Sequence, residues 1–147
     1  MELFVKKFDE LSVYELYEIL KLRSDVFVVE QDCVYLDLDD KDKNAWHVWL
    51  ASDDDVVACA RVLDKGVSYP DSLSIGRVVS KHRGIGLGAA VMEAAIKTAR
   101  EKYGDLPIMI SAQKYATAFY ERFGFVVTSE PYLEDNILHV KKRCQSA

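Results

Sequence analysis

With 147 residues, of which half are apolar and 29% are charged, the chain has the size and balance of one ordinary globular domain. Its formal net charge of −5 argues against nucleic acids and anionic membrane surfaces as partners, because both select basic proteins. Cys33, Cys59 and Cys144 form no zinc pattern, and no stretch has the apolar length of a signal peptide or a membrane span. We therefore expect a cytoplasmic protein without a disulfide framework.

The first half of the chain predicts a strand, a helix, a loop and two further strands. Ser12 and Glu15 form a capping box that begins a helix through about Arg23. The apolar run 26–29 is compatible with a helix or a strand, and the acidic stretch 37–43 is by default a solvated loop, although it could attract a cationic substrate. The strands of this half are expected at residues 2–8, 46–51 and 56–63.

The second half is organised around a strand, a glycine-rich loop and a long helix within residues 73–100. Val78 and Val79 close the apolar strand, and a helical apolar face begins at Leu87 and ends near Gly104. The remaining elements are expected as strands at 107–111, 125–128 and 137–142, a helix at 113–122 and a connection at 131–136. This order favours one α/β domain over residues 1–147, with a mixed sheet.

The loop between this strand and helix has the pattern of an anion-binding site. Its glycines allow the backbone to approach an anion closely, and a helix N-terminus presents unpaired amide groups. We expect a pyrophosphate cradle with His82 at its rim, formed by Arg83, Gly84, Ile85, Gly86, Leu87, Gly88 and Ala89. The plain alternative is a tight turn, and a Rossmann-like nucleotide site is disfavoured because the glycine spacing is not G-x-G-x-x-G.

Three segments resemble the GCN5-related N-acetyltransferase (GNAT) superfamily. The pattern Arg-x-x-Gly-x-Gly at 83–88 is similar to its acetyl-coenzyme A motif, and ATAFYERFGF at 116–125 is similar to its second motif. Upstream, LRSDVFVVEQDCVYLDLD at 22–39 resembles the ElaA-like subgroup. The resemblance implies an α/β (α+β mixed) acyl-CoA N-acyltransferase fold with a central mixed, mostly antiparallel sheet flanked by helices.

The resemblance also implies roles for single residues. Tyr120 matches the tyrosine that protonates the departing thiolate, and a phenol with a reference pKa of ~10 stays protonated at neutral pH. The amide groups of Val78 and Val79 would hold the pantetheine and the thioester carbonyl, and such donors are typically worth ~3 kcal/mol each. Gln113 stands where the superfamily commonly has a cofactor-contacting asparagine. Read without the motif, Tyr120 would be a core aromatic residue.

The general base is left open by the sequence. The candidates are Glu30, Asp37, Asp39 and His47, although a histidine next to Trp46 at a strand start is more often a packed structural residue. Arg77 lies inside an apolar strand and needs partners. An ion pair with the upstream acidic residues is our first interpretation, and contact with an acidic substrate group is the second.

These observations predict an N-acetyltransferase that moves an acetyl group from acetyl-CoA directly to an amine. The acceptor is a small-molecule or peptide amine of unidentified structure, and neither a metal, a nucleic acid nor a membrane is expected to take part. Direct transfer needs no acyl-cysteine, so Cys33 is interpreted as structural. The alternative is a non-catalytic acyl-CoA-binding sensor or partner module of the same fold. The superfamily often forms dimers, so a homodimer is compatible with the resemblance.

Overall fold

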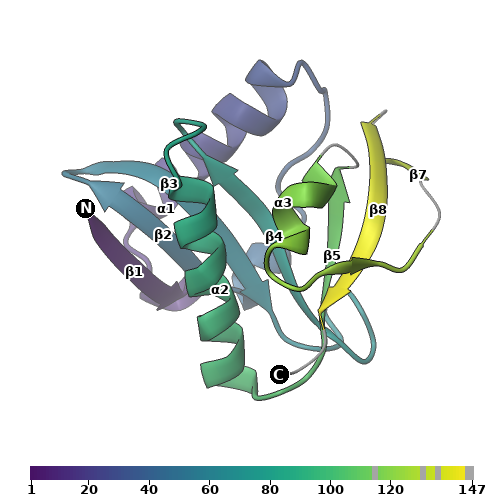
Figure 1. Cartoon of the computed structure of the whole chain (residues 1–147). Coiled ribbons are helices and arrows are strands. Elements are labelled where there is room, and N and C mark those ends of the chain that lie inside the picture. Colours follow the sequence, from purple (N-terminus) through teal and green to yellow (C-terminus); the bar gives the residue numbers. More distant parts are fainter. Residues whose placement is uncertain (114–115, 130–131, 135–136, 145–147) are drawn as a thin grey trace.

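Eight strands form one sheet within residues 1–113, 116–129, 132–134 and 137–144, which are the residues that the computed structural model describes (Figure 1). The strands are β1 (Glu2–Lys7), β2 (Trp46–Ser52), β3 (Asp55–Leu63), β4 (Leu73–Ser80), β5 (Ile108–Gln113), β6 (Val126–Val127), β7 (Tyr132–Glu134) and β8 (Ile137–Cys144). The helices are α1 (Val13–Arg23), α2 (Leu87–Tyr103) and α3 (Thr117–Glu121), with short 3₁₀ helices η1 (Phe8–Glu10) and η3 (Lys41–Asn44) and a π-helix η2 (Ser24–Glu30). No helix in these ranges is both long enough and apolar enough to cross a membrane.

The strand order in the sheet is β1-β2-β3-β4-β5-β8-β6, and β7 pairs with β8 beside this path. Every neighbouring pair is antiparallel except β4 and β5, which run parallel. The expected mixed, mostly antiparallel sheet is therefore confirmed, and β1 lies at one edge of it. Two parallel neighbours need a crossover connection, and α2 provides it.

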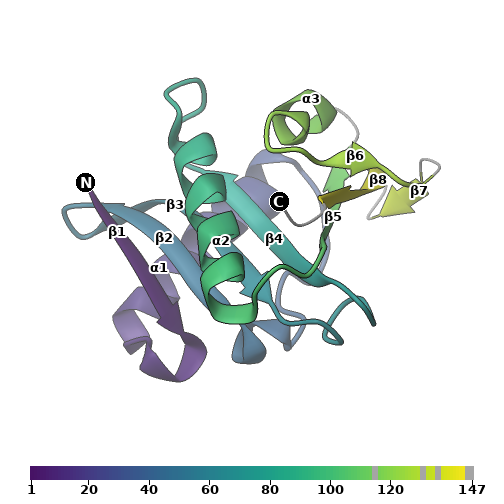
Figure 2. The same ribbon diagram turned by 60° about the horizontal axis from the view of Figure 1, so that its bottom comes forward.

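Helices cover both faces of the sheet, with α2 and α3 on one face and α1 and η2 on the other (Figures 1 and 2). Val48 and Leu50 of β2 pack in the core beneath α2, while Trp49 and Ala51 of the same strand pack beneath α1. This alternation follows from the two-residue repeat of a strand. The sheet therefore has two cores, and the second fixes α1 and the chain that follows it.

The predicted helix boundaries follow from their local signals. The Glu15 amide donates to Ser12 Oγ at 3.0 Å, and the Ser12 amide donates back to Glu15 Oε1 at 2.8 Å, so the capping box begins α1. After α1 the chain continues into the π-helix η2, which identifies the ambiguous run 26–29 as helical. Gly104 follows α2 with a φ of 80°, a left-handed conformation that glycine adopts without strain.

Two predicted boundaries near the C-terminus are wrong. Gln113 was expected to begin a helix, but it is the last residue of β5 and pairs with His139 of β8, so the helical part is α3 alone. The segment 131–136 was expected to be a connection, but residues 132–134 form β7, and the rest of it lies outside the described residues. In both places pairing with β8 overrides the local pattern, and β8 is distant in the sequence from β5 but adjacent to β7.

Candidate active site

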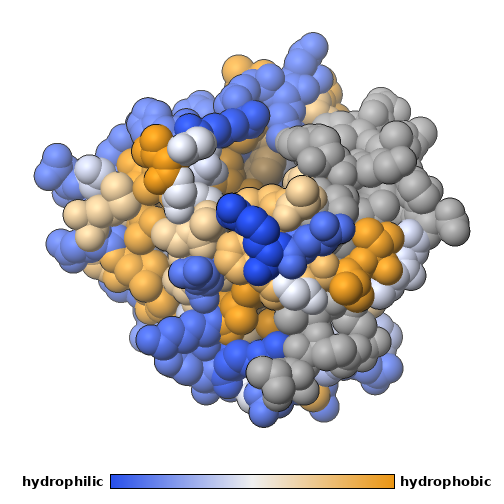
Figure 3. Space-filling model, viewed as in Figure 1, coloured by the Kyte–Doolittle hydropathy of each residue, from blue (hydrophilic) through white to orange (hydrophobic). Residues whose placement is uncertain are grey.

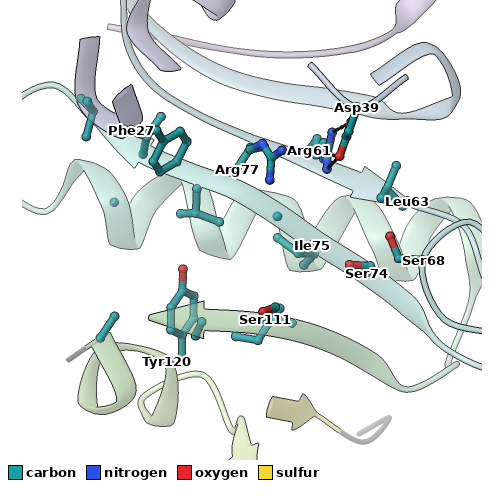
Figure 4. A pocket seen from close by; sticks show the side chains of 18 of the residues that line it. Phe27, Asp39, Arg61, Leu63, Ser68, Ser74, Ile75, Arg77, Ser111 and Tyr120 are labelled. Carbon is teal, nitrogen blue, oxygen red and sulfur yellow. Dashed lines mark hydrogen bonds and ion pairs between the residues drawn. The ribbon is translucent and has the colours of Figure 1, made fainter. Parts of the chain in front are cut away.

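A cavity opens where β4 and β5 separate. Within the described strands, Leu73 and Ser74 are the residues of β4 that pair with β5. Beyond them lies a cavity of about 900 Å³, lined by β4 from Ser74 to Ser80 and by residues 110–112 of β5 (Figure 4). Because the ladder stops early, backbone groups on this edge of β4 are left for a ligand.

β4 also carries a bulge against its other neighbour, β3. The register shifts between Cys59 and Arg61 of β3, where β4 has one residue more than its partner. Arg77 at this point has a φ of 51°, which is uncommon for a residue other than glycine. Val78 and Val79 follow the bulge and both line the cavity. Their predicted contact with a thioester carbonyl stays a prediction, and their position in the cavity wall is compatible with it.

The glycine-rich loop reaches the cavity from the N-terminus of α2, and the surface is hollowed beside it (Figure 3). Gly84 and Gly86 have φ values of 81° and 83°, which explains the need for glycine at both positions. Gly86 caps α2 without a side chain, so the amides of the first turn keep their hydrogen-bonding capacity. Arg83 and Gly88 line the cavity. The other residues predicted to bind the cofactor form the same turn beside it: Ile85, Leu87 and Ala89.

Arg83 is already paired with a carboxylate. Its Nη2 lies 3.0 Å from Glu30 Oε1, and both side chains are more than half exposed, at 60% and 53%. Glu30, one of the predicted bases, ends the π-helix η2 and is not among the residues that line the cavity. It therefore lies at the outer rim, where it neutralises the arginine expected to meet a pyrophosphate.

Tyr120 projects into the cavity from α3. Figure 4 shows its hydroxyl pointing away from α3 and toward β4. Edge-to-face contacts with Phe119 and Phe125, at centroid distances of 5.0 and 6.2 Å, fix the ring. Gly124, at a φ of 88°, turns the chain so that the fully buried Phe125 returns beneath the ring. Tyr120 is thus both a core aromatic residue and a cavity residue, and the two interpretations of the sequence are compatible.

Gln113 closes β5 at the edge of the same region. Its backbone pairs with β8, but its side chain lies outside the described part of the structure. The predicted contact of Gln113 with the cofactor therefore stays a prediction.

The acidic loop is not a solvated loop, which corrects the default interpretation of residues 37–43. Asp37 and Asp42 are buried, with exposed fractions of 7% and 6%, because three arginines from α1, β3 and β4 converge on this segment. We call the six residues the arginine–aspartate network, and they are Arg23, Arg61, Arg77, Asp37, Asp39 and Asp42.

Arg23, on α1, is the most deeply buried member of the network, with 1% exposure. Its Nε donates to Asp37 Oδ2 at 2.9 Å, and its Nη1 and Nη2 donate to the two carboxylate oxygens of Asp42 at 2.8 and 3.1 Å. One guanidinium therefore satisfies two buried carboxylates and fixes the loop to α1.

Arg61 and Arg77 connect the loop to the sheet. Arg61 binds both oxygens of Asp39, at 2.7 and 2.6 Å, and also reaches Asp42 at 3.1 Å. Arg77 Nε lies 2.8 Å from Asp37 Oδ1, and its Nη2 donates to the Asp37 carbonyl at 2.9 Å. The first interpretation of Arg77, an ion pair with upstream acidic residues, is confirmed.

The network makes Asp39 and Asp42 poor bases. Burial opposes the ionisation of Asp39, but hydrogen bonds from Arg61 outweigh it and hold the pKa of Asp39 far below its usual range. Burial likewise opposes ionisation of Asp42, and its bonds to Arg23 prevail, so its pKa is also lowered. Asp37 is held by Arg23, Arg77 and the hydroxyl of Tyr35. A base that must take a proton from an ammonium group needs a higher pKa than Asp39 and Asp42 have.

His47 lies in the interior and is not among the cavity residues. Its Nε2 is 2.9 Å from the carbonyl oxygen of Asp42, an acceptor, so this nitrogen carries the proton. Burial lowers its pKa, and the imidazole is neutral at pH 7. His47 therefore braces the acidic loop, which agrees with the structural alternative considered for it.

Several cavity residues were missed by reasoning from the sequence. They include Phe27, Lys41, Arg61 and Ser68. Arg61 could have been found, because it is a charged residue inside an apolar strand, the same signal that singled out Arg77. Lys41 begins the short helix η3 and Ser68 lies in a loop, and neither carries a comparable signal. Among the described residues, no group of histidine, cysteine and acidic side chains has the arrangement of a metal site.

Comparisons with known proteins agree on one family. Residues 18–146 match the model of the acetyltransferase (GNAT) domain. ElaA of Escherichia coli is 38% identical over 135 residues, which are 89% of this chain and 88% of that protein. Its crystal structure superposes with a TM-score of 0.92 over 99% of this chain and all of that one, at 35% identity. An acyl-CoA N-acyltransferase from Pseudomonas aeruginosa is 40% identical, with a TM-score of 0.91 over 97% of this chain and 98% of that one.

Proposed function

Because the chain belongs to the GNAT acetyltransferase family, we propose that it transfers an acetyl group from acetyl-CoA directly to the amine of a second substrate. The observation that carries this proposal is the separation of β4 and β5, which brings the glycine-rich loop and Tyr120 to one cavity. Acetyl-CoA supplies the acyl group as an activated thioester, and no acyl-enzyme is required.

The residues around the cavity fit acetyl-CoA as a substrate. The first turn of α2 offers free amides and the positive end of a helix dipole, and Arg83 adds a guanidinium, so this end suits a pyrophosphate. The unpaired edge of β4 suits the amide groups of the pantetheine arm, as an added strand would. No large side chain crosses the loop at Gly84 or Gly86, where a Cβ would meet open space.

We infer the chemical roles from the residues that line the cavity. In this proposal the segment Val78–Val79 binds the thioester carbonyl oxygen through a backbone amide as that oxygen becomes an oxyanion. The Tyr120 hydroxyl points toward β4, and in this proposal it donates its phenolic proton to the sulfur as the carbon–sulfur bond breaks. The amine forms the new bond to the carbonyl carbon, and free CoA leaves as a thiol.

Deprotonation of the amine determines the pH dependence. Asp39 is the carboxylate among the described cavity residues, and its lowered pKa keeps it ionised and ineffective as a base at neutral pH. We therefore expect kcat/KM to rise about tenfold per pH unit between about pH 6 and pH 9, tracking the free form of an amine with a pKa of ~10.4. Initial rates of thiol release across this range test it. A plateau above about pH 7 would instead indicate a protein base.

Titration calorimetry with acetyl-CoA, CoA, NAD and ATP tests the proposed donor. Acetyl-CoA and CoA should bind, NAD and ATP should not, and Arg83→Ala should weaken acetyl-CoA binding about tenfold, because a charge-assisted contact to phosphate is lost. Binding of NAD or ATP in place of the CoA compounds would overturn the proposal. Thiol release with a panel of amines then tests the transfer itself.

Glu30→Gln is the matched variant for this titration, because it removes the other partner of the same ion pair. Arg83 is then free for the ligand, and the affinity for acetyl-CoA should be unchanged or up to about fivefold higher, the range expected for an exposed pair. If both variants weakened the binding of acetyl-CoA, the ion pair itself, and not the free guanidinium, would support the loop.

A further inference from the structure

The cavity has a second end, away from the glycine-rich loop. Figure 4 shows Tyr120 and Phe27 at one end of the cavity and Ser68, with Leu63, at the other. Lys41 also lines the cavity, and its Nζ donates to Ser68 Oγ at 2.9 Å, which places its ammonium group at the Ser68 end. An acceptor that reaches Tyr120 with its amine therefore extends toward this lysine.

The charges of the cavity wall are paired, except at Lys41. The arginine–aspartate network holds equal numbers of positive and negative groups, and Arg83 is paired with Glu30. No carboxylate of the described residues forms an ion pair with the Lys41 ammonium group. Asp39, two residues away, directs both carboxylate oxygens to Arg61. This end of the cavity therefore carries a net positive charge.

The surrounding groups offer hydrogen bonds. Ser68 and Ser74 line this end with hydroxyl groups. A partly buried ammonium beside such donors favours an anionic group over an aliphatic tail or a second ammonium.

We propose that the acceptor amine carries a carboxylate, and that Lys41 binds this carboxylate while the amine faces Val78 and Tyr120. The proposal rests on the proposed acyltransferase function and adds the chemical class of its second substrate, an amino acid or a compound built like one. The cavity has a volume of about 900 Å³, at the upper end of what ligand sites usually enclose, which leaves room for an acceptor beside the pantetheine arm.

The test compares amines in matched pairs that differ only in the carboxylate. The panel contains α-amino acids and ω-amino acids of increasing chain length, each beside the amine that lacks the carboxyl group, and thiol release from acetyl-CoA is measured. Wild-type protein should show a kcat/KM at least about tenfold higher for the best carboxylate-bearing amine than for its partner, as expected for a hydrogen bond to a charged group.

Variants of Lys41 then test the assignment to one residue. Lys41→Ala should remove the preference by raising KM for the carboxylate-bearing amine, and Lys41→Glu should reverse it. Lys43→Ala is the matched control, because Lys43 is 65% exposed, pairs with the exposed Asp40 and does not line the cavity. Unchanged acetyl-CoA affinity in each variant shows that the site is still folded.

The outcomes distinguish the role of Lys41 from the acyltransferase function on which it rests. Acetylation of amines with no preference for a carboxylate, or a preference that survives Lys41→Ala, overturns the role of Lys41 and leaves the acyltransferase function standing. Acetyl-CoA binding without thiol release for any amine in the panel overturns the acyltransferase function, and this inference falls with it.

Discussion

Tyr120→Phe should lower kcat by about 10²–10⁴-fold, the range that a positioned general acid contributes. The hydroxyl that points across the cavity is the group that this substitution removes. Without it, the sulfur must depart as an unprotonated thiolate in a partly enclosed site. Single-turnover measurements with saturating acetyl-CoA and amine isolate this step from product release.

The control for Tyr120→Phe is the affinity for acetyl-CoA. The ring keeps its contacts with Phe119 and Phe125, so calorimetry should give a dissociation constant within about twofold of wild type. Loss of turnover with intact binding separates an enzyme from a sensor of the same fold, because a sensor has no turnover to lose. A variant that retained wild-type kcat would contradict the role of Tyr120 as the acid.

Arg23→Met should lower the free energy of unfolding by about 3–5 kcal/mol, as expected when one partner is removed from a buried ion pair. The substitution leaves the carboxylates of Asp37 and Asp42 buried with one guanidinium fewer between them. Methionine fills much of the vacated volume, so the loss reports the charge more than a cavity. Urea unfolding at pH 7 measures it.

The pH dependence of this loss in unfolding free energy shows whether it arises from charge or from packing. A lowered pKa in the folded state gives Asp42 a stabilising contribution that is present above its unfolded pKa of ~3.9 and disappears as the pH falls. Arg23→Met removes this contribution, so the difference from wild type should shrink below about pH 4. Lys43→Ala, which breaks an exposed pair in the same loop, should leave the unfolding midpoint nearly unchanged. A difference that stayed constant with pH would point to packing instead.

The part of the site nearest the glycine-rich loop could be predicted because its signals are local. Arg83, Gly84 and Gly86 lie within four consecutive residues, and the spacing of the apolar residues that follow predicts a helix. Tyr120 was predicted from its match to a contiguous family motif, and not from the hydrophobic pattern or charge of its segment. Its edge-to-face contact with Phe125 is a tertiary contact that the helix pattern does not reveal.

The acidic loop could not be predicted from local sequence patterns. Asp37 and Asp42 look like solvated residues because the arginines that bury them lie 14 to 40 residues away. The bulge at Arg77 follows from a register shift against β3, which a single strand's sequence does not reveal. Pairings over such distances are decided by the assembled sheet, and the pairing of β5 with β8 likewise determines where β5 ends.

The two ends of the cavity are built from different kinds of structure. The end proposed to bind acetyl-CoA belongs to β4 and to the start of α2, whose backbone groups cannot change without altering the fold. Lys41 and Ser68 lie in connections outside the strands, and their side chains support no core. Substitutions at Lys41 and Ser68 should therefore cost little stability, so under the proposed function the amine preference can change while the cofactor end of the cavity stays the same.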